Sequence, residues 1–173
     1  MNGTPIAFWY RSVQDDDLAA ILHIQAENYP REMQESPDVI AERIAAAPDT
    51  SLVTINSHGV CAYLFAYHSL LGRVTPLDGK FSIASKPDSL YLHDLAVSRQ
   101  STGLGIGRTL VNVAFELAKM RGISHSALIA VQRSSSFWAH LGFRVYNGLD
   151  ADSELMVRTY PGNPCYMVKA LLS

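Results

Sequence analysis

The sequence predicts an α/β fold, with a mixed central sheet of about seven strands and four helices that cover both faces of the sheet. Two observations support this prediction. β-branched and aromatic runs, typical of strands, alternate along the chain with segments of helical periodicity. The run at 127–131 is continuously apolar, which is typical of a strand buried on both faces. Because no internal repeat or low-complexity linker interrupts the series, we expect one domain over residues 1–173.

Local signals define the individual elements. The acidic residues 15–17 suit the positive end of a helix that Pro30 terminates. Ser36 and Pro37 form the cap and first turn of the next helix. Gly122 and Gly142 each follow a helical pattern as a C-terminal residue. In chain order we expect strands at 8–13, 51–56, 60–70, 90–97, 127–131, 143–147 and 164–172, and helices at 15–27, 36–47, between the glycines at 103–107 and Gly122, and at 134–142.

Composition excludes several classes of function. Charged residues make up 17% of the chain and the net charge is −2, so no basic field attracts nucleic acid or an anionic membrane. Cys61 and Cys165 belong to no Cys/His cluster, so we expect no metal site and two thiols in a reducing compartment. We expect neither a secretion signal nor a membrane span, and therefore a cytoplasmic protein with a small-molecule or protein partner.

The stretch 93–110, HDLAVSRQSTGLGIGRTL, places three glycines between a predicted strand and a predicted helix. Such a turn directs unpaired amides and a helix dipole at an anion, although the glycines could equally serve only to make a tight turn. A Walker A loop needs a different glycine spacing and a lysine. The dinucleotide fingerprint needs GxGxxG followed by an acidic residue, whereas this chain has GxGxG and no acidic residue between Gly122 and His140. Both nucleotide folds are therefore excluded.

The same stretch resembles the GNAT family of N-acetyltransferases. Gln100-Ser-Thr-Gly103-Leu-Gly105 matches the family signature of Arg or Gln, two residues, Gly, one residue, and Gly or Ala. Downstream, FWAHLGF at 137–143 is similar to the family's FYxxLGF segment, and the order of elements agrees along essentially the whole chain. The resemblance implies a mostly antiparallel sheet with one splayed parallel pair, strands 90–97 and 127–131, and acetyl-CoA bound in the gap as cosubstrate without a metal.

The resemblance also implies the cofactor contacts. The backbone of Leu95, Ala96 and Val97 would hold pantetheine, with the Leu95 amide as oxyanion donor. The cations Arg99, Arg108 and Arg133 would neutralise phosphates, or are simply solvated. The amides from Gln100 to Arg108, with the side chain of Thr109, would hold the pyrophosphate, and the 134–137 segment would line the pantetheine arm. The residues implied are Leu95, Ala96, Val97, Gln100, Thr102, Gly103, Leu104, Gly105, Ile106, Gly107, Arg108, Thr109, Ser134, Ser136 and Phe137.

Amine acetylation requires a proton acceptor, because an alkylamine with a pKa of about 10.4 is almost entirely protonated at neutral pH. Strand alternation places Tyr91, His93 and Leu95 on one face and Asp94 on the other, and His93 is the imidazole that suits a general base there. A packed core histidine is the alternative. YLHDLAV resembles the HLHVLAV-type strand of arylalkylamine acetyltransferases, where the matching histidine relays the proton, and the YLED strand of diamine acetyltransferases. We expect Asp94 to be structural.

The sequence departs from the family at Trp138, where many relatives carry a tyrosine that protonates the leaving thiolate. An indole N–H is too weak an acid for that role. Water, His140 or Tyr146 would have to protonate the thiolate instead, and we therefore include Tyr146 with His93 and Leu95 among the catalytic candidates. A domain that binds acyl-CoA without turnover is the alternative.

The turn between the first two helices would wall the acceptor pocket, with Glu27, Tyr29, Glu32 and Glu35 as candidates alongside Tyr91 and His93. The Gly-, Pro- and Ser-rich segment 71–89 is long for a connection and would cover this pocket or be mobile. We predict transfer of the acetyl group of acetyl-CoA to a small primary amine by direct attack in a ternary complex. A non-catalytic acyl-CoA sensor, or acetylation of a protein N-terminus or lysine, stays open. A homodimer is common in the family, but no sequence feature indicates one.

Overall fold

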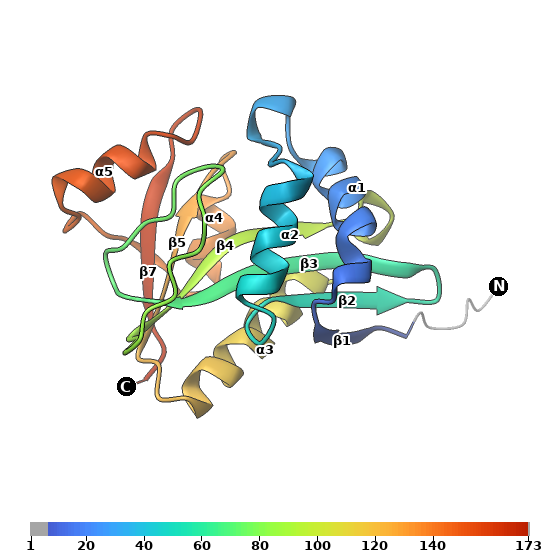
Figure 1. Cartoon of the computed structure of the whole chain (residues 1–173). Coiled ribbons are helices and arrows are strands. Elements are labelled where there is room, and N and C mark those ends of the chain that lie inside the picture. Colours follow the sequence, from blue (N-terminus) through green and yellow to red (C-terminus); the bar gives the residue numbers. More distant parts are fainter. Residues whose placement is uncertain (1–6, 173) are drawn as a thin grey trace.

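A computed structural model describes residues 7–172 of the chain. One seven-stranded sheet runs through it in the order β1-β2-β3-β4-β5-β7-β6, and only β4 and β5 are parallel neighbours (Figure 1). The strands are β1 Trp9–Ser12, β2 Leu52–Asn56, β3 Gly59–Ser69, β4 Ser89–Val97, β5 His125–Ala130, β6 Arg144–Val145 and β7 Cys165–Ala170. The helices are α1 Leu18–Asn28, α2 Pro37–Ala46, α3 Ile106–Met120, α4 Ser135–His140 and α5 Ala151–Val157.

Helices cover both faces of the sheet (Figure 1). On one face, α1 and α2 pack Ile21, Ile24 and Ile40 against β2 and β3. On the other face, α3 packs Leu110 and Phe115 against β3 and β4. A third cluster, rich in tyrosine, lies where the 71–89 segment meets β3, β4, β5 and β7. The predicted fold class, including the splayed parallel pair, is confirmed.

The local signals were mostly sufficient to define the elements. Ser36 caps α2 by accepting a hydrogen bond from the Val39 amide, and the hairpin β2–β3 turns at the predicted residues. Two expectations were wrong. The strand expected at 143–147 is only two residues long, and a fifth α-helix, α5, follows it. Asp150 caps α5 through the Ser153 amide, but α5 has only seven residues and none of them is buried, which is too short and too exposed for a clear helical pattern in the sequence.

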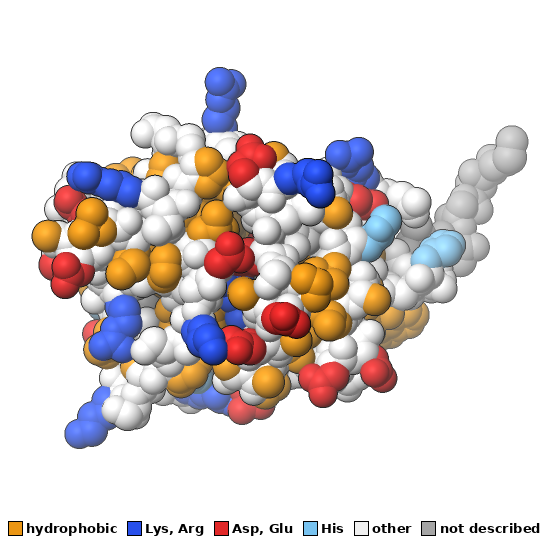
Figure 2. Space-filling view, turned by 45° about the horizontal axis from the view of Figure 1, so that its top comes forward, with side chains coloured by type: hydrophobic (Ala, Val, Ile, Leu, Met, Phe, Trp, Pro, Cys, Tyr) orange, Lys and Arg blue, Asp and Glu red, His pale blue; other side chains and the backbone are white. Residues whose placement is uncertain are grey.

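The surface agrees with the composition. On the face seen in Figure 2, acidic and basic side chains are interspersed and form no large patch of one sign. Within residues 7–172, no helix is both long and apolar enough to cross a bilayer. The residues of the predicted signal-free N-terminus that precede position 7 lie outside the described part of the chain.

Candidate functional site

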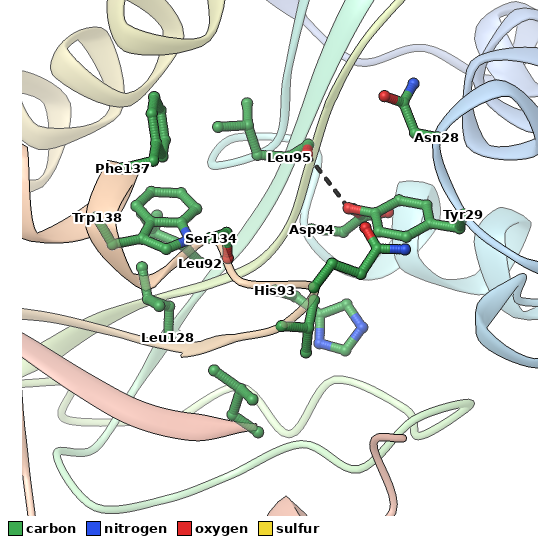
Figure 3. Close-up of a pocket in the computed structure, with 13 residues that line it drawn as sticks. Asn28, Tyr29, Leu92, His93, Asp94, Leu95, Leu128, Ser134, Phe137 and Trp138 are labelled. Atoms are coloured by element: carbon green, nitrogen blue, oxygen red, sulfur yellow. Dashed lines mark hydrogen bonds between the residues drawn. The ribbon is translucent and has the colours of Figure 1, made fainter. Parts of the chain in front are cut away.

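The site begins where β4 and β5 separate. Their parallel pairing ends at Leu92 with Leu128, although β4 continues to Val97. A cavity of about 160 Å³ occupies the gap beyond that point. Its walls are Asn28, Tyr29, Leu92, His93, Asp94, Leu95, Leu128, Ile129, Val131, Gln132, Ser134, Phe137 and Trp138 (Figure 3). We call this space the central cavity.

A β-bulge in β4 determines which side chains face which helices. Asp94 pairs with Phe65 and Leu92 with Ala66, so His93 is an extra residue without a partner in β3. Leu92 and Leu95 therefore both pack toward α3, while His93 and Asp94 both face the α1–α2 side. Strand alternation had placed Leu95 with His93 and had placed Asp94 on the opposite face. Both expectations were wrong, because one inserted residue reverses the alternation.

The backbone of β4 offers hydrogen-bonding groups to the gap. The Ser98 amide donates to the Cys61 carbonyl, which makes Ser98 and Cys61 a hydrogen-bonded pair of the antiparallel β3–β4 ladder. Such pairs alternate along the ladder, so the amides and carbonyls of Leu95 and Val97 point away from β3. Their carbonyls accept from side chains at the end of α1, namely Tyr29 at 3.3 Å and Asn28 at 3.0 Å. The amides of Leu95 and Val97 are thus directed toward the gap, where an extended ligand could pair with them.

The glycine turn ends in an unpaired row of amides. Gly103 and Gly105 have φ values of +81° and +76°, which a residue with a Cβ rarely adopts. The Thr102 amide donates to Arg99 and the Thr109 amide to Gly105, but the amides from Gly103 to Arg108 meet no acceptor within the described residues. They stand at the N-terminus of the fifteen-residue helix α3, which suits a phosphate group.

The opposite wall of the central cavity comes from α4 and the turn before it. Ser134, Phe137 and Trp138 line the cavity, and in Figure 3 Phe137 and Trp138 lie on one side of Leu95 and Tyr29 on the other. Trp138 is 8% exposed, and its ring meets Phe137 and Phe143 edge-on. The tryptophan is therefore part of both the cavity wall and the core.

A narrow recess continues from the central cavity on the α1–α2 side. It has a volume of about 30 Å³ and shares Tyr29, His93, Asp94 and two β5-side residues with the cavity. Its own walls, Met33, Glu35, Leu77 and Tyr160, are mostly apolar. Beyond Met33 the surface opens into a groove of about 670 Å³ formed by Glu32, Met33, Gln132, Arg133, Ser135, Pro161, Gly162 and Asn163. We call these spaces the acceptor recess and the outer groove.

Asp94 is held by two phenols. Its carboxylate accepts hydrogen bonds from Tyr29 at 2.5 Å and from Tyr63 at 2.6 Å. Burial raises the pKa of Asp94 above its ordinary value, although both phenol donors favour the ionised form. Burial and the nearby Asp94 carboxylate also raise the pKa of Tyr29 well above 10. Asp94 therefore anchors Tyr29 at the boundary between the central cavity and the acceptor recess.

Glu35 and His93 belong to a buried charged cluster. The Glu35 carboxylate accepts from both terminal nitrogens of Arg43, from the Asp78 amide at 3.0 Å and from His93 Nε2 at 3.3 Å. The side chains of Glu35, Arg43 and His93 are each 3% exposed or less. Burial disfavours the ionised carboxylate, but His93 and Arg43 outweigh that effect and lower the pKa of Glu35 to about 2.

The model of the family described as "Acetyltransferase (GNAT) family" matches residues 18–143. The chain belongs to the GNAT family of acetyltransferases. That assignment confirms acetyl-CoA as the predicted cosubstrate. Three features of the site fit a CoA thioester: the free amides of 103–108, the amides of Leu95 and Val97 that point away from β3, and the central cavity between them.

Solved structures with the same fold are distant in sequence. Ard1 from Thermoplasma volcanium has a TM-score of 0.73 at 13% identity, with 96% of this chain and 99% of that chain covered. PaiA N-acetyltransferase from Thermoplasma acidophilum, solved with coenzyme A, has a TM-score of 0.67 at 16% identity and coverages of 95% and 99%. The ribosomal-protein-S18-alanine N-acetyltransferase from Escherichia coli has a TM-score of 0.66 at 15% identity and 96% coverage of both chains. Curated protein sequences give no match.

Several predicted site residues of this GNAT acetyltransferase lie elsewhere. Tyr91 is 1% exposed within the tyrosine-rich core, and the Ala96 side chain is buried against α1 while its backbone pairs with β3. The carboxylate of Glu27 accepts from the Arg99 amide, and its carbonyl accepts from the Arg99 guanidinium. Tyr146 lines a different pocket beside β7. Neither Ser136 nor His140 lines the central cavity; both are exposed on α4, where His140 Nδ1 contacts the Ser136 carbonyl.

The remaining predicted residues lie near the cofactor path. Gln100 and Thr102 precede the row of free amides, Leu104 is 54% exposed, and Ile106 is buried against β4 while its amide stays free. The Thr109 hydroxyl donates to the Gly105 carbonyl. Arg108 is exposed in the first turn of α3, whereas Arg133 lines the outer groove.

Sequence reasoning missed Arg43, Asn28 and Gln132. A signal for Arg43 existed, because its spacing from Ile40 and Ile44 places it on the apolar stripe of α2, where an arginine needs a buried partner. Gln132 and Arg133 have φ values of +50° and +62°, and this left-handed pair turns the chain between the central cavity and the outer groove. No sequence signal marks that turn, because neither residue is a glycine.

Proposed function

We propose that this GNAT protein transfers the acetyl group of acetyl-CoA to the primary amine of a small molecule by direct attack in a ternary complex. One observation carries the proposal. The central cavity and the acceptor recess meet at His93, Asp94 and Tyr29, so a thioester lying between β4 and β5 and an amine entering past Met33 would converge there. No covalent enzyme intermediate is needed, because both substrates reach the same residues.

Acetyl-CoA supplies the activated acyl group when it is bound. The Leu95 amide would stabilise the negative charge that develops on the thioester oxygen. His93 would accept the proton of the attacking amine, directly or through a water, because a neutral imidazole has a nitrogen lone pair that can take a proton. Trp138 stands on the α4 wall where the family has its tyrosine, and the Tyr29 phenol that lines the cavity already donates to Asp94, so we propose that water protonates the thiolate.

The acceptor is proposed to be an amine with an apolar body, as in the arylalkylamine group. Met33, Leu77, Ile129, Val131 and Tyr160 make the recess mostly apolar. Glu35 does not act as a free anion there, because Arg43 neutralises it. Among the described residues of the recess itself, Asp94 is the one carboxylate that is not paired with an arginine, and its oxygens already accept from two phenols, so the recess offers little to a second cationic group such as that of a polyamine. These features favour a monoamine.

A free-thiol assay over arylalkylamines, polyamines, amino acids and aminoglycosides tests the proposal. We expect acetyl-CoA-dependent thiol release with arylalkylamines. Measurable CoA binding without turnover of any amine would refute the catalytic function and would leave an acyl-CoA sensor. His93→Ala should lower kcat by roughly 10²–10⁴-fold at neutral pH and recover as the pH rises. The exposed His58→Ala, at the β2–β3 turn, is the matched control.

The outer groove supports a second candidate, acetylation of a protein N-terminus or lysine. Its volume of about 670 Å³ far exceeds that of the recess, and the two spaces share Met33 as a wall, so a chain lying in the groove could extend its amine into the recess. Against this candidate, the 71–89 segment closes one side of the recess through Leu77. A peptide panel with free α-amines in the same assay distinguishes the two. We further propose a cytoplasmic location, in line with the free thiols Cys61 and Cys165, and a single domain; the homodimer stays a prediction.

A further inference from the structure

Two hydrogen bonds with the Gln25 side chain fix the backbone of Glu35. Glu35 lies in the connection between α1 and α2. The buried side chain of Gln25, on α1, accepts from the Glu35 amide at 3.0 Å and donates to the Glu35 carbonyl at 3.0 Å. A glutamine that is 3% exposed on an apolar helix face is costly unless both ends of its amide are paired, and here both are. Gln25 therefore holds Glu35 in one place.

The Glu35 carboxylate determines which of the neighbouring atoms must carry a proton. An ionised carboxylate only accepts hydrogen bonds, so every group that contacts it must donate. The Arg43 guanidinium and the Asp78 amide can only donate. His93 Nε2 is the one contact that could be either donor or acceptor, and the carboxylate requires it to carry a proton.

The second ring nitrogen of His93 then has a defined role. Nδ1 is buried and has no hydrogen-bond partner within the described residues. In a neutral imidazole whose proton lies on Nε2, Nδ1 holds the lone pair. A buried acceptor without a partner costs about 1–3 kcal/mol, which a donor from a bound ligand or water would offset. The His93 side chain is 2% exposed, and His93 is among the residues that line the central cavity and the acceptor recess, so we place such a donor on that side.

We propose that Glu35 is a positioning residue that locks His93 in the Nε2-protonated tautomer and so assigns proton acceptance to Nδ1. This inference rests on the proposed function of His93. In the step concerned, the amine nitrogen bonds the acyl carbon while the carbonyl π pair moves onto the thioester oxygen, the amine N–H bond breaks, and an Nδ1–H bond forms on His93. The carbonyl then re-forms as the C–S bond breaks, and the sulfur leaves with that electron pair as the CoA thiolate, which water protonates. The resulting imidazolium is paired with the Glu35 carboxylate, and its proton later leaves to water.

The 71–89 segment also contacts Glu35, Arg43 and His93. The Asp78 amide donates to Glu35, the Gly79 carbonyl accepts from Arg43, and the Phe81 ring meets His93 edge-on at 5.4 Å between centroids. Arg43 lies over the same Phe81 ring at 5.0 Å. The charged and titratable groups that surround His93 are thus Glu35, Arg43, Asp94, Tyr91 and Tyr160. Of the described residues, only Glu35 makes a polar contact with the ring.

NMR of the chain labelled with ¹⁵N-histidine tests the tautomer without relying on activity. The chain has six histidines, and comparison with His93→Gln assigns the signals of His93. At a pH where the ring is neutral, we expect the chemical shift of a protonated nitrogen at Nε2 and of an unprotonated one at Nδ1. Protonated Nδ1 in the wild-type chain would overturn the proposal, whether or not the chain acetylates any amine.

A double variant tests the role of Glu35. Glu35→Met alone would leave Arg43 buried and unpaired, so Glu35→Met with Arg43→Met removes the pair together. We expect mixed tautomers of His93 and a fall in kcat of roughly tenfold or more, with KM for the amine unchanged. The matched control is Glu42→Met with Lys80→Met, which removes an exposed ion pair between α2 and the 71–89 segment. An unchanged tautomer and kcat in the Glu35 and Arg43 double variant would overturn the proposal.

Discussion

The two ion pairs that involve α2 should differ greatly in energy, and a pair of double-mutant cycles measures the difference. Arg43 and Glu35 are 1% and 3% exposed, whereas Lys80 and Glu42 are 79% and 51% exposed. Removing one partner of a buried pair leaves an uncompensated charge and costs about 3–5 kcal/mol. An exposed pair contributes about 0–1 kcal/mol. The perturbations are the single and double methionine variants of each pair.

The acid response gives a second magnitude for the same carboxylate. The pKa of Glu35 falls from an ordinary 4.5 to about 2, and at about 1.4 kcal/mol for each pH unit this corresponds to about 3 kcal/mol. Because the pKa is lowered in the folded chain, the unfolded chain binds the proton first as the pH falls. The stabilisation is therefore fully present above about pH 4.5 and is lost as the pH falls toward 2.

Urea unfolding at pH 7 and at decreasing pH provides the measurement. At pH 7, we expect each single variant of the buried pair to lose about 3–5 kcal/mol and the double variant to recover most of that loss. The coupling energy should decline only below about pH 4.5. A coupling energy for Glu35 and Arg43 no larger than that of Glu42 and Lys80 would show that the buried pair does not hold the site together.

Three further predictions concern the walls of the site. Gly105→Ala should cost about 1–2 kcal/mol of stability, because the φ of Gly105 is +76°, and should weaken CoA binding roughly tenfold. The control Gly59→Ala, also at positive φ, should cost stability alone. Equal CoA affinities of the two variants, measured by calorimetry, would contradict the phosphate role of the glycine turn. Tyr29→Phe removes one hydrogen-bond donor from Asp94 and should cost about 1–3 kcal/mol in urea unfolding; an unchanged stability would show that this hydrogen bond does not stabilise the fold. Leu77→Ala should widen the acceptor recess and shift relative kcat/KM toward bulkier amines by roughly tenfold or more. If the wild-type chain and the variant prefer the same amines, Leu77 is not a wall of the recess.

The glycine turn and the start of α3 were predictable because they depend on local sequence. Positive φ at Gly103 and Gly105 is a property of a few adjacent residues, and the helix that follows begins where the pattern places it. The acceptor side was not predictable in the same way. Glu35 was recognised only as one of several carboxylates in a turn, because its partners Arg43, Asp78 and His93 come from three other segments of the chain.

The β4 strand separates what the sequence determined from what the tertiary structure decided. The sequence by itself determined the strand, the glycine turn after it and the family, because strand propensity, left-handed glycines and helix spacing act over short distances. The tertiary structure decided which face Asp94 and Leu95 occupy, through the bulge at His93, and it paired His93 with Glu35. A bulge is fixed by the register between two strands, and a buried charge is tolerated only beside its partner, so neither follows from a single segment.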